Sequence, residues 1–152
     1  MLDRFEQFSG YISAIYRNIQ KLQREEMVKY GLKGAYAQYL MTIRRFQNGI
    51  TCSELCDICD RDKAAVSRII VDLEKKGLLE RRGQNNNLYR ALLFLTEEGK
   101  RAADFVSERA KIAVEKAGLR FNEEQRNQFY SALGLISTNL QAICEVGIPE
   151  QI

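Results

Sequence analysis

The residues from Lys63 to Lys76 combine a helical apolar stripe with side chains that suit the edges of DNA bases. The apolar stripe consists of Val66, Ile69, Ile70 and Leu73. The other faces of the predicted helix carry Lys63, Ala64, Ser67, Arg68 and Val71. Arginine can pair bidentately with guanine, serine can donate or accept, and alanine or valine methyl groups can contact the thymine methyl group. An ordinary helix with one solvated face shows the same pattern, so the pattern alone leaves both interpretations open.

The positive charge of the chain is concentrated around this predicted helix. The 152 residues carry a formal net charge of only +3. Residues 61–90 contain eight basic and four acidic side chains, a net charge of +4, so the remainder of the chain is slightly acidic. A local basic excess of this kind is where contacts to DNA phosphates are expected.

The chain contains no histidine, which excludes several kinds of catalytic site. A Ser-His-Asp triad, a Cys-His pair, a histidine general base and a histidine metal ligand are all ruled out. We expect no enzymatic activity, no cofactor and no metal. The longest apolar run covers only residues 91–95, and the first twenty residues lack the apolar core of a signal peptide. We therefore expect a cytoplasmic protein that has no membrane partner.

Three of the four cysteines, Cys52, Cys56 and Cys59, fall on one short predicted helix. Their C-x3-C-x2-C spacing matches the cluster-binding motif of radical S-adenosylmethionine enzymes. Those enzymes place the motif on a loop of a much larger barrel, so packing as small apolar side chains is the preferred interpretation. A thiol redox switch is the alternative, because Cys52 would lie in the first turn of its helix, which favours a thiolate.

Capping residues and turn residues divide the chain into elements. Four predicted helices begin at Thr51, Asp62, Thr96 and Asn122, and Thr51 forms a capping box with Glu54. Breaks are predicted at Tyr30-Gly31, Asn48-Gly49 and Gly77. Residues 78–82 and 88–95 read as two strands of a hairpin. The order of elements is that of a mainly α fold with a small β-hairpin wing, a winged helix-turn-helix.

The first and last predicted helices each carry a heptad-like apolar seam. The first seam consists of Phe5, Phe8, Ile12, Ile15, Ile19 and Leu22. The second consists of Phe129, Leu133, Ile136, Leu140 and Ile143. Such seams fit a core helix and an intersubunit helix equally well. We expect dimerisation helices at 1–30 and 118–152, a winged helix-turn-helix at 31–100 and a connecting helix at 101–117.

The segment from Glu54 to Lys100 resembles the MarR family of bacterial transcriptional regulators. The motifs that carry the resemblance are Glu54-Leu55, Val66-Ser67-Arg68, Leu73-Glu74-x-x-Gly77-Leu78, Glu80-Arg81 and Leu95-Thr96-x-x-Gly99. The resemblance implies a homodimer that binds a pseudo-palindromic operator on double-stranded DNA. It also implies a recognition helix in the major groove, a wing in the minor groove and release by a small, often phenolic, ligand.

The resemblance also assigns candidate DNA-binding residues. On the two helices of the helix-turn-helix they are Ser53, Lys63, Ala64, Ala65, Ser67 and Arg68. On the wing they are Arg81, Arg82, Asn85, Asn86 and Arg90. Family wings usually carry an Asp-x-Arg or Asp-Arg-Arg group about eight residues before the Leu-Thr pair, whereas this chain has Asn87-Leu88-Tyr89 there. Arg81, Arg82 or the asparagine amides are therefore alternatives to Arg90 for the minor groove.

Four tyrosines on the first two predicted helices are candidate contacts for a small aromatic effector: Tyr11, Tyr16, Tyr36 and Tyr39. Packing in the core is the alternative for aromatic residues at helical spacing. Taken together, the sequence predicts a dimeric, sequence-specific DNA-binding transcriptional regulator that acts as a repressor. The competing functions are a redox-sensing regulator and a dimeric interaction module without DNA binding, and the local positive charge disfavours the second.

Overall fold

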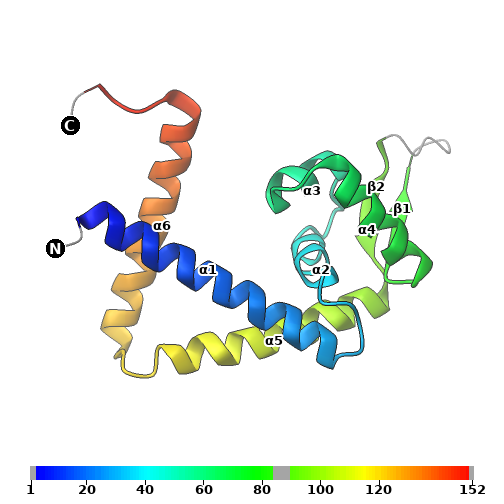
Figure 1. The fold of residues 1–152 in the computed structure, drawn as a ribbon, viewed down its shortest axis with the longest axis horizontal. Coiled ribbons are helices and arrows are strands. Elements are labelled where there is room, and N and C mark those ends of the chain that lie inside the picture. The colour runs from blue at the N-terminus through cyan, green and yellow to red at the C-terminus, as the bar shows by residue number, and fades with distance from the viewer. Residues whose placement is uncertain (1–2, 84–89, 151–152) are drawn as a thin grey trace. The chain divides into compact units, whose positions relative to one another are not determined.

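The computed structural model describes residues 3–83 and 90–150 (Figure 1). In chain order the elements are α1 (Arg4–Lys29), α2 (Tyr36–Arg44), α3 (Cys52–Cys59), α4 (Lys63–Lys75), β1 (Leu79–Arg82), β2 (Leu92–Leu95), α5 (Glu97–Ala117) and α6 (Glu123–Val146). The two strands form an antiparallel hairpin between α4 and α5. The predicted mainly α winged helix-turn-helix is therefore confirmed. The chain divides into two compact units, Met1–Ile112 and Ala113–Ile152.

Side-chain caps start the helices where the sequence predicts them. The Thr51 hydroxyl accepts a hydrogen bond from the Glu54 amide at 3.2 Å, and the Glu54 carboxylate accepts from the Thr51 amide at 2.8 Å. Asp62 and Asn122 cap α4 and α6 through the amides three residues later. The Thr96 hydroxyl does the same for α5. Each cap satisfies a backbone donor that the first helical turn leaves without a partner.

Two predicted boundaries are wrong. Helix α2 ends at Arg44 rather than at Asn48, and Phe46 lies outside it. The residues after α2 instead form turns that bring Ile50 to Leu93, where the two backbones exchange hydrogen bonds of 2.8 and 3.2 Å. The backbone hydrogen bonds between Ile50 and the hairpin stabilise the fold more than the further helical hydrogen bonds of a longer α2 would.

The second strand begins at Leu92 rather than at Leu88. Strand β1 has four residues, and the register pairs Leu79 with Leu95 and Arg82 with Leu92. Beyond Arg82 the first strand offers no further partner within the described residues, so the ladder ends there. Residues 88 and 89 of the predicted strand lie outside the described residues.

The core of the first unit joins every element of the helix-turn-helix to its neighbours. It includes Met27 of α1, Tyr36, Leu40 and Ile43 of α2, Leu55 of α3, Val66, Ile70 and Leu73 of α4, Leu93 and Leu95 of β2, and Ala102 and Val106 of α5. Each large apolar side chain buried in this way contributes about 1.5–3 kcal/mol relative to exposure. The predicted apolar stripe of α4 is confirmed, because Val66, Ile70 and Leu73 are buried and Ile69 packs against the core.

The C-terminal end of α1 and its cap residue Tyr30 contact α5 through ion pairs and an aromatic pair, and the Tyr30 hydroxyl donates to the Glu98 carboxylate at 3.3 Å. The Glu26 carboxylate binds the Lys29 ammonium at 2.6 Å and the Arg109 guanidinium at 3.2 Å. The rings of Tyr30 and Phe105 lie 5.2 Å apart between centroids. These contacts fix the end of α1 against α5 and so against the winged helix.

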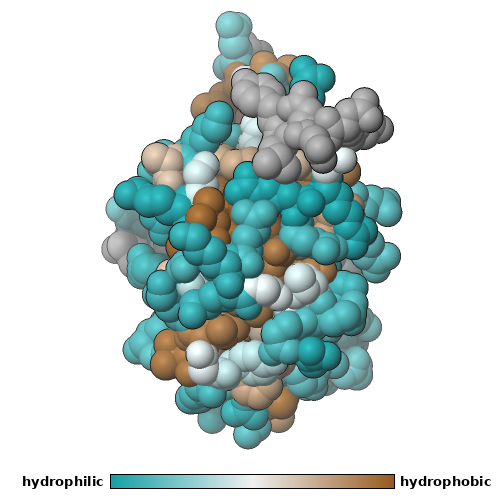
Figure 2. Space-filling model, turned by 90° about the vertical axis from the view of Figure 1, so that its right-hand side faces the viewer, coloured by the Kyte–Doolittle hydropathy of each residue, from teal (hydrophilic) through white to brown (hydrophobic). Residues whose placement is uncertain are grey.

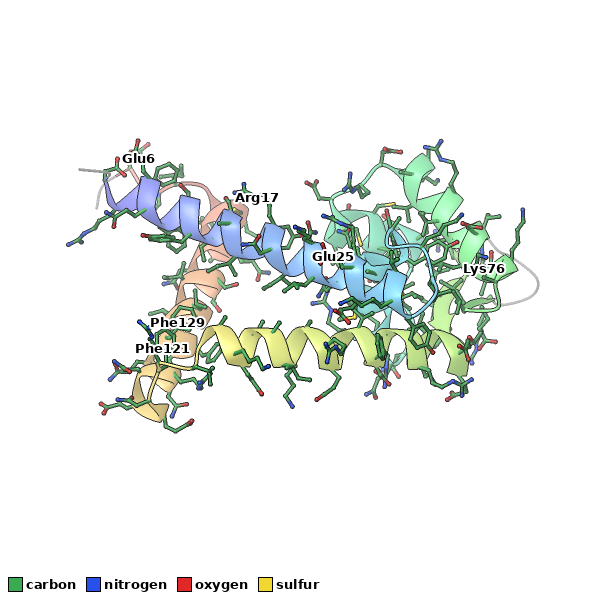
Figure 3. The ribbon with its side chains drawn as sticks, turned by 60° about the horizontal axis from the view of Figure 1, so that its bottom comes forward. Glu6, Arg17, Glu25, Lys76, Phe121 and Phe129 are labelled. Atoms are coloured by element: carbon green, nitrogen blue, oxygen red, sulfur yellow. The ribbon has the colours of Figure 1, made fainter. Side chains whose placement is uncertain are left out.

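The second unit contains the end of α5, a short turn and α6. The Phe121 and Phe129 rings, labelled in Figure 3, lie 5.8 Å apart across this turn. No described residue of α6 is buried, although the helix carries 24 residues. Among the described residues, no helix combines the length and the apolar character needed to cross a membrane.

Candidate nucleic-acid interface

Helices α3 and α4 form a helix-turn-helix with a very short connection. The connection covers residues 60–62, and Asp60 adopts the left-handed conformation with φ of 50°. This conformation turns the chain sharply between α3 and α4. The Cys59 carbonyl, just before this connection, accepts a hydrogen bond of 3.0 Å from the Gln38 side-chain amide. This hydrogen bond ties the start of the connection to α2.

The predicted recognition residues lie on the part of α4 that the core does not use. Lys63, Ala64 and Arg68 are exposed, and Ala65 and Ser67 are half-buried. Within the described part of the chain, no ion pair involves Lys63 or Arg68. Lys63 lies in the first turn of α4, where the helix dipole adds positive potential, and Arg68 lies in the second turn. This end of α4 therefore presents positive charge to solvent.

The C-terminal half of α4 is anchored by Asp72. Its carboxylate accepts a hydrogen bond of 2.5 Å from the buried Tyr36 hydroxyl and one of 2.8 Å from the Lys33 ammonium. The hydrogen bond from Lys33 holds the pKa of Asp72 below its ordinary value. Burial and the nearby carboxylate raise the pKa of Tyr36, which keeps its hydroxyl protonated as a donor. The sequence analysis did not identify this anchor, which joins residues 36 positions apart.

The two arginines of β1 are already engaged within the protein. Arg81 forms two hydrogen bonds to the Glu74 carboxylate, at 3.0 and 2.8 Å, and thereby joins β1 to α4. Arg82 pairs with Glu80, and its guanidinium lies 4.3 Å from the centroid of the Phe94 ring. Arg81 is thus bound at the base of the wing, whereas Arg82 is more exposed.

The remaining candidates lie at the edges of this surface. Ser53 is exposed in the first turn of α3. Arg90 is exposed just before β2, and Asn85 and Asn86 lie outside the described residues. The side of the molecule on which the wing strands lie is mostly hydrophilic, with smaller hydrophobic patches between (Figure 2). The structure therefore brings the basic residues of α4 and the hairpin into one compact unit.

The three cysteines of α3 face the core. Cys59 is buried, and its sulfur lies 3.8 Å from the Thr42 hydroxyl, while Cys52 and Cys56 are half-buried against the core. The packing interpretation is therefore confirmed. Burial raises the pKa of both the Cys56 and the Cys59 thiols, which disfavours the thiolate. The described residues contain no group of three or more side chains placed to hold a metal ion.

The four candidate tyrosines do not line one cavity. Tyr36 is fully buried and bound to Asp72, and Tyr11 is 70% exposed. Tyr16 lines a cavity of about 320 Å³ between α1, α2 and α5. Tyr39 lines an adjoining cavity of about 490 Å³ between α1, α2 and α4, which shares Gln20, Gln23 and Gln38 with the first. The first two helices thus border two hollows rather than one aromatic pocket.

Comparison with known proteins places this arrangement in a family. The sequence model of the MarR family matches residues 30–86. The chain is 26% identical over 105 residues to the uncharacterized HTH-type transcriptional regulator YybA of Bacillus subtilis, covering 68% of this chain and 70% of that protein.

Solved structures extend the similarity over the whole chain. A MarR family transcriptional regulator from Listeria monocytogenes in complex with a 26mer DNA is 26% identical, with a TM-score of 0.73 and full coverage of both chains. A MarR transcriptional regulator from Methanosarcina mazei Go1 is also 26% identical, with a TM-score of 0.77 over 94% of each chain. On its motifs and its fold, this chain is similar to the MarR family of winged-helix transcriptional regulators, whose sequence model matches residues 30–86.

Proposed function

We propose that this regulator binds double-stranded DNA sequence-specifically as a homodimer and represses transcription at a pseudo-palindromic operator. The observation that carries the proposal is the exposed face of α4, where Lys63 and Arg68 are free of ion pairs among the described residues. The Listeria monocytogenes relative, similar over its whole length, was crystallised with DNA. A helix of this kind docks its N-terminal residues in the major groove.

In this proposal, α4 reads bases through Lys63, Ala64, Ala65, Ser67 and Arg68. Ser53 binds a phosphate from the first turn of α3, where backbone amides and the dipole favour an anion. Arg82 and Arg90 serve the wing, together with Asn85 and Asn86. Arg81 contributes least to DNA binding in this proposal, because its guanidinium is already hydrogen-bonded to the Glu74 carboxylate.

Exposed apolar side chains on both units support the proposed homodimer. On α1, Phe5, Ile12 and Ile15 are 73%, 39% and 48% exposed. On α6, Phe129, Ile136 and Leu140 are 39%, 37% and 47% exposed. An exposed apolar seam of this extent is typical of an interface. Residues 1–30 and 118–152 therefore form the proposed dimerisation helices, residues 31–100 the DNA-binding domain and residues 101–117 the connection.

Selection of bound sequences from a random DNA pool tests the proposal. The expected result is two inverted half-sites with centres about 10 base pairs, one helical turn, apart. Affinity for the selected site should fall steeply with salt, because each phosphate contact releases about one counterion. No enrichment, or a single half-site without symmetry, would contradict the dimeric DNA-binding function. A reporter driven from the selected site, with and without the protein, tests repression.

A further inference from the structure

Two carboxylates in the C-terminal half of α4 are bound from different sides of the helix. The Asp72 carboxylate accepts a hydrogen bond of 2.5 Å from the Tyr36 hydroxyl of α2. The Glu74 carboxylate accepts two hydrogen bonds, of 3.0 and 2.8 Å, from the Arg81 guanidinium of β1. Because successive residues of an α-helix are rotated by about 100°, positions 72 and 74 lie about 200° apart around the axis. We call these two links, Tyr36–Asp72 and Arg81–Glu74, the clamp of α4.

The clamp is placed to control where the exposed face of α4 points. Arg68 is exposed and stands two positions before the buried Ile70, so the two side chains point to nearly opposite faces of the helix. Asp72 lies one turn after Arg68, and side chains four positions apart are neighbours on a helix surface. Any rotation of α4 about its axis would therefore move Arg68 and strain the Tyr36–Asp72 bond at the same time.

A small rotation of α4 is large on the scale of a hydrogen bond. With side chains, an α-helix has a radius of about 5–6 Å, so a rotation of about 20° moves its surface by about 2 Å. The donor–acceptor distances of hydrogen bonds span only about 0.5 Å. A side chain that reads a base edge must accordingly be held within about 10–20° of its working direction.

Apolar packing sets this direction less sharply than the clamp does. The hydrophobic effect is non-directional, and burial of Val66, Ile70 and Leu73 determines which face of α4 turns to the core. Hydrogen bonds weaken steeply as their angles bend, and a two-point guanidinium–carboxylate pair adds geometric specificity. Tyr36 is fully buried, so the core holds its hydroxyl in place as a donor.

We infer that Tyr36 with Asp72, and Arg81 with Glu74, are positioning residues for sequence recognition, because together they fix the rotation of α4 over the base edges. This role rests on the proposed function, in which α4 reads bases. Contacts to bases depend on the direction of each side chain, whereas attraction to the phosphates depends mainly on charge. Loosening the clamp should therefore lower discrimination between DNA sequences more than it lowers general affinity for DNA.

Tyr36→Phe tests the first link, because it removes one hydroxyl without changing the charge. Its affinity for the selected operator should fall by at least about fivefold, the lower limit for one good base contact, and its affinity for a scrambled duplex by less than about twofold. Fluorescence anisotropy at one salt concentration measures both affinities. Tyr30→Phe is the matched control, since the Tyr30 hydroxyl also donates to a carboxylate, at 3.3 Å, but that of Glu98 on α5. It should leave the ratio of the two affinities unchanged.

Glu74→Asp tests the second link with the charge retained. The side chain is shorter by one methylene group and should lose the two-point bond to Arg81, so the ratio of the two affinities should again fall by at least about fivefold. Asp104→Glu is the matched control. It makes the reverse change of one methylene group in the two-point pair that joins Arg44 of α2 to Asp104 of α5, and it should leave the ratio unchanged.

The ratio of the two affinities separates positioning from stability. A variant that is only less folded loses both affinities by the same factor. An unchanged ratio in Tyr36→Phe or in Glu74→Asp would remove that link from the clamp, and an unchanged ratio in both would overturn the role. An equal fall in Tyr30→Phe or Asp104→Glu would also overturn it, because the effect would not be specific to α4.

Failure of the proposed function gives a different result. In that case the wild type itself binds the selected and the scrambled duplex equally, and the positioning role falls with it. Strong discrimination by the wild type that survives in both clamp variants would overturn the positioning role alone.

Discussion

Arg68 and Arg81 carry the same guanidinium group but differ in what that group contacts. Arg81 forms a two-point hydrogen bond with Glu74 and is half-buried at the base of the wing. Arg68 is exposed on α4, and no ion pair engages it within the described residues. A bidentate pair to a guanine edge needs an unoccupied guanidinium fork, which Arg68 has. The contacts that each arginine makes within the protein, rather than its residue type, therefore determine how much it contributes to the proposed DNA interface.

Arg68→Ala should weaken binding to the selected operator by about 10- to 100-fold, because a base contact of this kind is worth about 1–3 kcal/mol. Arg90→Ala should cost less, since the wing motif around Arg90 lacks the usual aspartate. Fluorescence anisotropy titrations at one salt concentration measure both variants. Thermal unfolding of Arg68→Ala should match the wild type, as no intramolecular pair is lost. A larger loss for Arg90→Ala would reverse this ranking.

Gly99 shows a second effect of a single side-chain position. A Cβ atom added there would lie 2.0 Å from the Leu78 carbonyl oxygen, which is too close for any contact. Gly99→Ala should therefore destabilise the fold by about 1–3 kcal/mol, because α5 and the start of the hairpin must separate. Urea unfolding measures the change. Gly10→Ala is the control, since nothing lies within 4 Å of the added atom and a helical alanine should stabilise by about 0.5–1 kcal/mol. Equal stability of Gly99→Ala and wild type would contradict the close approach.

At the scale of elements, the winged helix is held by contacts between segments distant in sequence. Asp72 ties α4 to Tyr36 of α2, and Glu26 ties α1 to Arg109 of α5. Both carboxylates also bind a lysine. Hydrogen bonding and positive charge stabilise the ionised form of each carboxylate, so these links depend on pH.

Glu26 predicts a defined pH dependence of stability. The hydrogen bond from Lys29, assisted by Arg109, keeps its pKa in the folded state below the ordinary value of 4.5. Because the pKa is lower in the folded state, ionised Glu26 stabilises the fold at pH values above its pKa in the unfolded chain. This stabilisation is lost as the pH falls through the pKa of Glu26 in the folded state. Glu26→Gln should thus be less stable than wild type at pH 7, and the difference should narrow as the pH falls below 4.5.

Urea unfolding at a series of pH values measures this difference. Glu25→Gln is the control, because the Glu25–Lys21 pair is 3.8 Å long and exposed, and it should have a smaller effect at pH 7. A difference for Glu26→Gln that stays constant or widens in acid would contradict the assigned role of Glu26.

At the scale of the whole molecule, each unit leaves an apolar surface on a long helix. Helix α6 has no buried residue within its described span. The apolar side chains of α1 from Phe5 to Ile15 are likewise exposed. A chain that leaves this much apolar surface in water gains free energy by covering it in an oligomer.

Ile15→Glu should weaken self-association by at least about tenfold, because a carboxylate would be buried in the proposed interface. Sedimentation across a concentration series measures the shift from dimer to monomer. Ser13→Glu places the same charge on an exposed position away from the seam and should leave association unchanged. Affinity for the two-fold operator should fall with association in Ile15→Glu. An unchanged dimer would exclude this part of α1 from the interface.

Local sequence alone determined where most elements start and which face of α4 is buried. Thr51, Asp62, Thr96 and Asn122 cap their helices as predicted, because capping depends on residues only three positions apart. The apolar stripe of α4 follows from helical period in the same way. The family motifs then supported the order of elements and the position of the exposed basic face.

Only the tertiary structure decided what each exposed or polar side chain does. The end of α2 and the start of β2 depend on pairing between Ile50 and Leu93 and on the register of the hairpin, which join residues far apart in the chain. The pairing of Arg81 with Glu74 and of Tyr36 with Asp72 depends on packing in the same way. Contacts between segments distant in the chain leave no period or motif in the sequence. They arise when the core brings these segments together.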